Sequence, residues 1–148
     1  MRRFERKLIV VATLVILGSA GSGDLRLFPT SPSLAQGRPA PAREEYAALP
    51  GVRIWFKDTG GSGVPVVFLH AATGHSQVWE NQIPAITGAG YRFIAYDRRG
   101  WGRSVVDPSG PQPGTGAEDL NRLMDYIGVD RFHLVATAAG GSVALDSA

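Results

Sequence analysis

The sequence has 148 residues, of which 44% are hydrophobic, 19 are glycine and 10 are proline, a composition typical of a single globular domain. It has no cysteine, which excludes disulfides, thiolate metal sites, cysteine nucleophiles and redox roles. Five of the 15 Lys and Arg but only two of the 13 Asp and Glu lie in residues 1–35, so the remaining chain has no positive excess, and we expect a small-molecule partner and no nucleic acid.

The first residues have the pattern of a secretory signal peptide. Four basic side chains precede an uncharged apolar run, Leu8 to Leu17, and small residues follow it. About ten apolar residues are too few to span a bilayer, which needs roughly 20, so we expect membrane contact only if the segment stays uncleaved. The sequence therefore predicts a signal peptide over residues 1–35, cleaved after Ala20 or Ala35, and an exported, periplasmic or secreted protein.

Residues 36–50 are rich in proline and alanine and carry mixed charge, which indicates a solvated lead-in. A folded domain is expected over residues 51–148. Its first strand is predicted at Val52–Asp58, where β-branched and aromatic residues gather before a glycine-rich turn.

Three further strands are predicted from short apolar runs at Val66–Leu69, Phe93–Ala95 and Phe132–Val135. Continuous apolar runs of this length are typical of parallel strands that are covered by helices on both faces.

Helical patterns lie between these runs. One covers Trp79–Ile86, and the other has apolar residues at helical spacing from Leu120 to Ile127. Thr115 is placed to cap the second helix and Gly128 to end it in a left-handed conformation. The alternation of strands and helices predicts an α/β fold with a doubly wound, mostly parallel sheet.

Ligands of such sheets bind beyond the carboxyl ends of the strands, so the segments after Leu69, Tyr96 and Val135 are the candidate functional loops. Each has an unusual sequence: HAATGHS, DRRGWGRS and ATAAGGS.

From Val52 onward these motifs resemble the α/β-hydrolase superfamily, in its esterase, lipase and peroxidase-like branch. Phe68–His70 looks like the start of the family's oxyanion loop, with Ala71 where the family has glycine. Residues 79–84 are similar to its W-x-x-Q-I-P helix, and Asp97–Ser104 to its D-x-R-G-x-G-x-S turn. The resemblance implies ester-type hydrolysis through an oxyanion hole, with a serine nucleophile on a strained Gly-x-Ser-x-Gly elbow.

At the elbow the chain departs from that pattern. Aligning the last strand places Ala138 at the nucleophile position, and an alanine methyl cannot attack an ester. A shifted elbow at Gly140–Ala144 would make Ser142 the nucleophile, and Thr137 is a further alternative. The ordinary alternative for both hydroxyls is a backbone hydrogen bond at a turn or helix start.

Other site residues follow from the same resemblance. The backbone N–H groups of Ala72 and Ala139 occupy the oxyanion-hole positions, where no particular side chain is needed. His75 is the expected ligand contact, and His70 is expected to be a hydrogen-bonded scaffold residue. Asp97 and Arg99 are expected to pin the turn after their strand.

No histidine follows Ala138, and Asp146 is the one titratable residue after it, so the triad base expected from the family is missing. No metal-ligand spacing or phosphate-binding loop occurs, and no cofactor is expected. We therefore interpret the chain as the N-terminal part of an exported hydrolase domain, truncated and inactive alone. Two alternatives stay open: a non-catalytic binding descendant, and general-base or lyase chemistry in a full-length relative.

Overall fold

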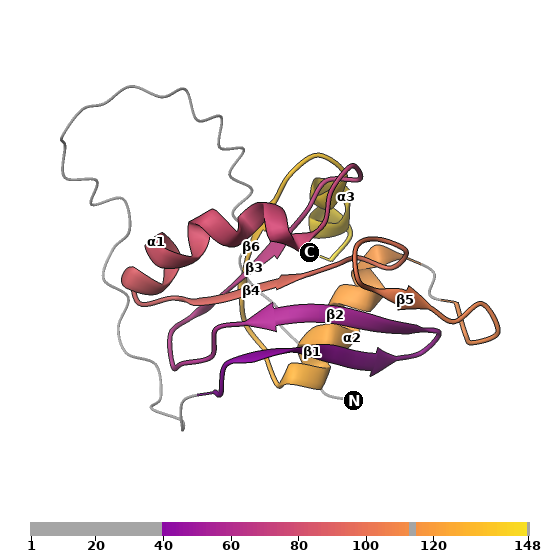
Figure 1. Ribbon diagram of the computed structural model, residues 1–148, viewed down its shortest axis with the longest axis horizontal. Helices are drawn as coiled ribbons and strands as arrows, with labels where there is room; N and C mark the ends of the chain where they lie inside the picture. Colours follow the sequence, from indigo (N-terminus) through magenta and orange to yellow (C-terminus); the bar gives the residue numbers. More distant parts are fainter. Residues whose placement is uncertain (1–39, 113–114, 148) are drawn as a thin grey trace.

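The computed structural model describes residues 40–112 and 115–147. The predicted signal peptide and the first part of the lead-in lie outside these residues. The described chain forms a twisted sheet with helices on both faces (Figure 1). Within this part of the chain, no helix has the length and apolar character needed to cross a membrane.

The sheet begins earlier than the sequence predicted. β1 (Arg43–Leu49) pairs antiparallel with β2 (Val52–Asp58) along its whole length, so the prediction of a solvated lead-in up to residue 50 is wrong for this segment. β1 lies at the edge of the sheet and buries little besides Ala47, which is fully buried. A charged edge strand of this kind lacks the apolar pattern on which strand prediction depends.

The other strands are β3 (Pro65–Leu69), β4 (Arg92–Tyr96), β5 (Val105–Val106) and β6 (His133–Ala136). The strand order is β1-β2-β4-β3-β6, with β5 paired to β2. The sheet is mixed: β1 and β2 are antiparallel to their neighbours, whereas β4, β3 and β6 run parallel as predicted. β6 is the second edge of the sheet within the described residues.

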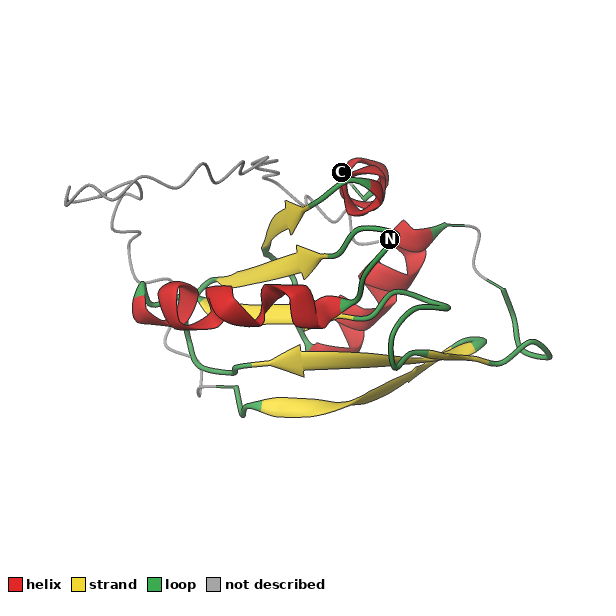
Figure 2. Cartoon of the chain, turned by 45° about the horizontal axis from the view of Figure 1, so that its top comes forward, coloured by secondary structure: helices red, strands yellow, loops and turns green. Residues whose placement is uncertain are grey.

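Both faces of the sheet are covered (Figure 2). One face packs against η1 (Ser76–Gln82) and α1 (Ile83–Gly88), around a small core that contains Phe68 and Phe93. The other packs against α2 (Gly116–Ile127) and α3 (Ala139–Asp146) around the main core. The helix predicted at residues 79–86 is thus a 3-10 turn that continues into a short α-helix.

The predicted ends of α2 are confirmed. The side chain of Thr115 accepts a hydrogen bond from the backbone N–H of Glu118 at 3.3 Å, which is the capping interaction. Gly128 has φ 71° and ψ 40°, the left-handed conformation that stops a helix at low cost for glycine.

A buried ion pair ties three strands together at one end of the sheet. The side chain of Asp58 is fully buried and accepts hydrogen bonds from Nε and Nη2 of Arg92 on β4. Arg43 of β1 reaches the same carboxylate at 3.3 Å. Because a buried charge without a partner is costly, this pairing keeps β1, β2 and β4 in register.

α3 approaches β3 so closely that one position admits only glycine. A Cβ atom on Gly140 would lie 2.6 Å from the carbonyl oxygen of Leu69 and 3.0 Å from that of His70. The neighbouring Gly141 has nothing within 4 Å of its Cβ position. The two adjacent glycines therefore have different roles, and they provide a matched pair of variants.

We predict that Gly140→Ala lowers the free energy of unfolding by about 1–3 kcal/mol, because α3 or β3 must move to admit the methyl group. Gly141→Ala should raise it by up to about 1 kcal/mol, since alanine favours a helix more than glycine does. Urea denaturation of both variants and the parent chain measures this. Equal effects of the two substitutions would contradict the close approach of α3 to β3.

Candidate functional site

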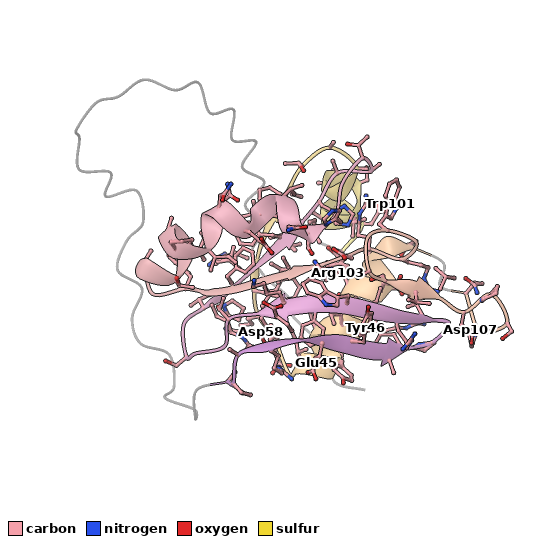
Figure 3. The ribbon with its side chains drawn as sticks, viewed as in Figure 1. Glu45, Tyr46, Asp58, Trp101, Arg103 and Asp107 are labelled. Atoms are coloured by element: carbon pink, nitrogen blue, oxygen red, sulfur yellow. The ribbon has the colours of Figure 1, made fainter. Side chains whose placement is uncertain are left out.

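The loops that leave β3, β4 and β6 meet at one end of the sheet, where the sequence predicted the site. The N–H of Arg98 donates to Nε2 of His70 at 3.0 Å, which joins the first two loops. The N–H of Thr137 donates to the carbonyl oxygen of Leu69 at 3.2 Å, which joins the third. Figure 3 labels Trp101 and Arg103 on the loop after β4.

Ala138 has a backbone conformation that side chains rarely adopt. Its φ of 46° and ψ of −119° make it the one non-glycine residue with positive φ in the described part of the chain. Such a conformation costs on the order of 1–3 kcal/mol and persists only where its surroundings impose it. Two backbone hydrogen bonds hold the turn. The N–H of Gly140 donates to the carbonyl oxygen of Thr137 at 2.9 Å, and the N–H of Gly141 donates to that of Ala138 at 2.8 Å.

Ser142 does not lie at this bend. It is an exposed residue inside α3, so the alternative of an elbow at Gly140–Ala144 does not match the backbone. Thr137 is exposed and directly precedes the bend. The strained residue between strand and helix is Ala138, which is itself exposed.

Ala72 and Ala139 are both partly buried at this end of the sheet. Ala139 is the first residue of α3, where a backbone N–H has no partner inside the helix. Neither its N–H nor that of Ala72 donates a hydrogen bond to another described residue. Both groups can therefore donate to an oxygen atom of a ligand.

Asp97 pins its turn, as predicted, and also holds the loop after β3. Its buried carboxylate accepts from the backbone N–H of Ser76 at 2.7 Å and from that of Arg103 at 2.8 Å. Burial alone would raise the pKa of this carboxyl, but the hydrogen bonds from Ser76 and Arg103 outweigh it and lower the pKa. Gly102 lies against the carboxylate, and a Cβ there would be 2.3 Å from Oδ2.

His70 has the bonds of a scaffold residue. Its Nε2 accepts from the backbone of Arg98, which leaves Nδ1–H to donate to the carbonyl oxygen of Ala71 at 2.7 Å. Burial lowers its pKa, which favours the neutral ring. With both nitrogens in main-chain hydrogen bonds, His70 has no nitrogen left to act as a base.

His75 is partly buried at the start of η1, beside the turn that Asp97 holds. A Cβ on Gly102 would lie 2.8 Å from the Cβ of His75, so the loops after β3 and β4 touch here. Its Nδ1 is buried and has no hydrogen-bond partner among the described residues. Of the two histidines on the loop after β3, His75 is thus the one with a nitrogen that no described residue contacts by a hydrogen bond.

Arg99 also fastens the turn after β4, as predicted, and does so by bonding to other elements. Its guanidinium makes two hydrogen bonds of 2.9 Å to the carboxylate of Asp119 on α2. It also donates to the carbonyl oxygens of Pro50 and Gly51 at the β1–β2 turn.

A cavity of about 280 Å³, which the sequence reasoning missed, opens between the loop after β4 and the start of α2. Its lining residues are Tyr96, Arg98, Arg99, Trp101, Thr115, Gly116, Asp119 and Val143. No single sequence motif predicts this cavity, because its lining residues come from β4, the loop after β4, α2 and α3. In the described residues no group of three or more potential metal ligands occurs.

A family model described as alpha/beta hydrolase fold matches residues 64–146. Among curated proteins, the chain is 43% identical over 91 residues to a non-heme chloroperoxidase of Kitasatospora aureofaciens, covering 62% of this chain and 33% of that protein. It is 35% identical over 96 residues to a bifunctional esterase/perhydrolase of Acinetobacter calcoaceticus, covering 64% of this chain and 35% of the relative.

Among solved structures, epoxide hydrolase A of Mycobacterium thermoresistibile superposes with a TM-score of 0.60 at 28% identity, covering 72% of this chain and 34% of that one. The chain thus spans about a third of the length of the relatives that it matches.

The strain at residue 138 predicts that Ala138→Gly raises the free energy of unfolding by about 1 kcal/mol, because glycine tolerates positive φ. The control is Ala139→Gly, which puts glycine in the helix one residue later and should be neutral or destabilising. Chemical denaturation of the two variants gives the comparison. Destabilisation by Ala138→Gly would show that the bend is not strained.

The lowered pKa of His70 predicts a pH dependence of stability. Below the unfolded-state pKa of 6.5, the unfolded chain binds a proton that the folded chain resists, so the free energy of unfolding should fall as the pH drops from neutral. In His70→Asn this part of the slope should vanish, although the variant starts from lower stability. Unfolding curves at several pH values test this; parallel pH profiles of parent and variant would refute it.

Proposed function

Since the chain belongs to the α/β hydrolase fold family, we propose that its three loops form the oxyanion-binding part of an ester-hydrolase type of site. In this proposal the N–H groups of Ala139 and Ala72 hold a carbonyl or carboxylate oxygen of a small molecule. Ala138 occupies the nucleophile position. The ancestral activity is ester-type hydrolysis, and this chain by itself forms no acyl intermediate at residue 138.

The observation that carries the proposal is the backbone of Ala138. A nucleophile elbow needs a sharp, strained bend between strand and helix so that the side chain stands above the sheet. Ala138 has that strained conformation, is exposed, and is directly followed by the start of α3. An alanine without such a role would relax to ordinary angles or be replaced by glycine.

The first turn of α3 supports an oxyanion at this place. The N–H of Ala139 donates to no other described residue, and the helix dipole adds a partial positive charge at the same point. The side chain contributes nothing to this binding, so replacing serine by alanine removes the attacking oxygen and leaves the oxyanion donors in place. Binding of the carbonyl group without covalent chemistry follows from that difference.

We also propose that the basic and apolar pattern of residues 1–35 directs export to the periplasm or the medium. Fractionation of expressing cells tests this, with a variant in which Arg2, Arg3, Arg6 and Lys7 are replaced by glutamate as the control. Equal amounts of both proteins in the cytoplasm would refute it.

The elbow can be tested with a nucleophile that needs no base. The sequence has no cysteine, so Ala138→Cys introduces a single thiol, and a thiolate attacks esters without an adjacent base. With p-nitrophenyl acetate, the sulfur bonds to the carbonyl carbon and p-nitrophenolate leaves. The matched control, Ser142→Cys, places the thiol on the exposed face of the same helix.

Both variants are also alkylated with iodoacetamide, a displacement that develops no oxyanion and so corrects for thiolate content and access. We expect the ratio of acylation to alkylation rate to be at least about tenfold higher for Ala138→Cys than for Ser142→Cys, because a single oxyanion donor is worth about 100-fold or more in rate. Equal ratios would overturn the proposal. So would labelling of the parent chain by a fluorophosphonate probe, which reports a nucleophilic serine.

A further inference from the structure

The cavity beside the start of α2 is separate from the elbow, since Ala72, Ala138 and Ala139 are not among its lining residues. We propose that it is a second binding site, for a small monocarboxylate with an apolar body. The carboxylate would lie among Arg98, Tyr96 and the first turn of α2, and the apolar body against Trp101 and Val143.

Tyr96 supplies a polar group that nothing in the described structure uses. The residue is 1% exposed, and its hydroxyl is buried without a hydrogen-bond partner. Tyr96 belongs to the main core on the side of α2 and α3, so it faces the cavity it lines. Burial raises the pKa of this hydroxyl, which therefore stays protonated and can donate a hydrogen bond.

Arg98 supplies the positive charge. Its Nε and Nη2 atoms are buried and have no partner among the described residues, and its guanidinium lies 5.8 Å from the centre of the Trp101 ring. The nearby carboxylate of Asp119 does not neutralise it, because both of its oxygens accept from Arg99. Two buried donors without a partner are a costly arrangement that an anion would relieve.

The first turn of α2 completes the polar end. Thr115 caps the helix through its side-chain oxygen, and the N–H groups at the start of a helix have no partners inside it. The helix dipole favours an anion at this end. α2 has 12 residues, so its dipole is fully developed.

The residues that line the cavity indicate the chemical class of its ligand. Arg99 and Asp119 in the lining neutralise each other, so Arg98 leaves a net charge of +1, which matches the single negative charge of a monocarboxylate. The volume of about 280 Å³ exceeds what a bare ion needs, and the lining includes the apolar side chains of Trp101 and Val143. An aromatic or branched apolar body fits that wall.

Benzoate is the probe. Calorimetric titration of the full chain should give saturable binding with one site. Arg98→Gln should weaken it about 10- to 100-fold and Tyr96→Phe about 3- to 10-fold, as expected for losing a charged or a neutral hydrogen bond. Arg122→Gln is the control, since this arginine lies on α2, pairs with Glu118 and is absent from the cavity lining. It should bind as the parent does.

Tyr96→Phe removes one oxygen atom and keeps the packing, so it tests the proposal even if Arg98→Gln folds poorly, and circular dichroism checks the fold of each variant. The proposal is overturned if the parent shows no saturable binding, or if Tyr96→Phe and Arg98→Gln bind benzoate as tightly as the parent does. Binding of inorganic phosphate without binding of benzoate would also overturn it, because the apolar wall would then play no part.

Discussion

The geometry of the functional end of the molecule depends on one buried carboxylate. Asp97 leaves the end of β4 and accepts hydrogen bonds from Ser76 at the start of η1 and from Arg103 in its own turn. These bonds fix the loop after β3 against the loop after β4, and the bond between His70 and the backbone of Arg98 adds a second link. Because the carboxylate is buried, losing one of its hydrogen bonds leaves a buried charge less well satisfied, so these bonds hold the two loops together as one unit.

The two proposed sites lie next to different parts of that unit. The elbow at Ala138 contacts the end of β3 through the hydrogen bond from Thr137 to Leu69, whereas the cavity lies between the loop after β4 and the start of α2. α3 separates them, with its first residue at the elbow and Val143, one turn later, in the cavity wall. α3 therefore contributes residues to both places.

The sequence was sufficient to predict most of the core and insufficient for the features that depend on distant partners. β2 was predicted at its observed bounds, and the apolar runs located β3, β4 and β6 to within about one residue, because buried parallel strands have a strong local pattern. β1 was missed because its strand character comes from pairing with β2 and not from its own residues. The cavity was missed for a similar reason: the unused hydroxyl of Tyr96 and its neighbour Arg98 become a site only when α2 and α3 pack beside them. The bend at Ala138 was located by motif, yet its torsion angles required the structure.

Residue 138 has one further property. The bend is held by backbone hydrogen bonds of Thr137, Gly140 and Gly141 and by the close contact of Gly140 with β3, none of which involves the side chain at 138. The backbone around residue 138 thus determines the shape of the bend, whereas its side chain determines whether the bend has a reactive group. Selection can exchange alanine and serine there without rebuilding the protein, so chemistry at this elbow could be lost or regained along a lineage while the fold is inherited unchanged.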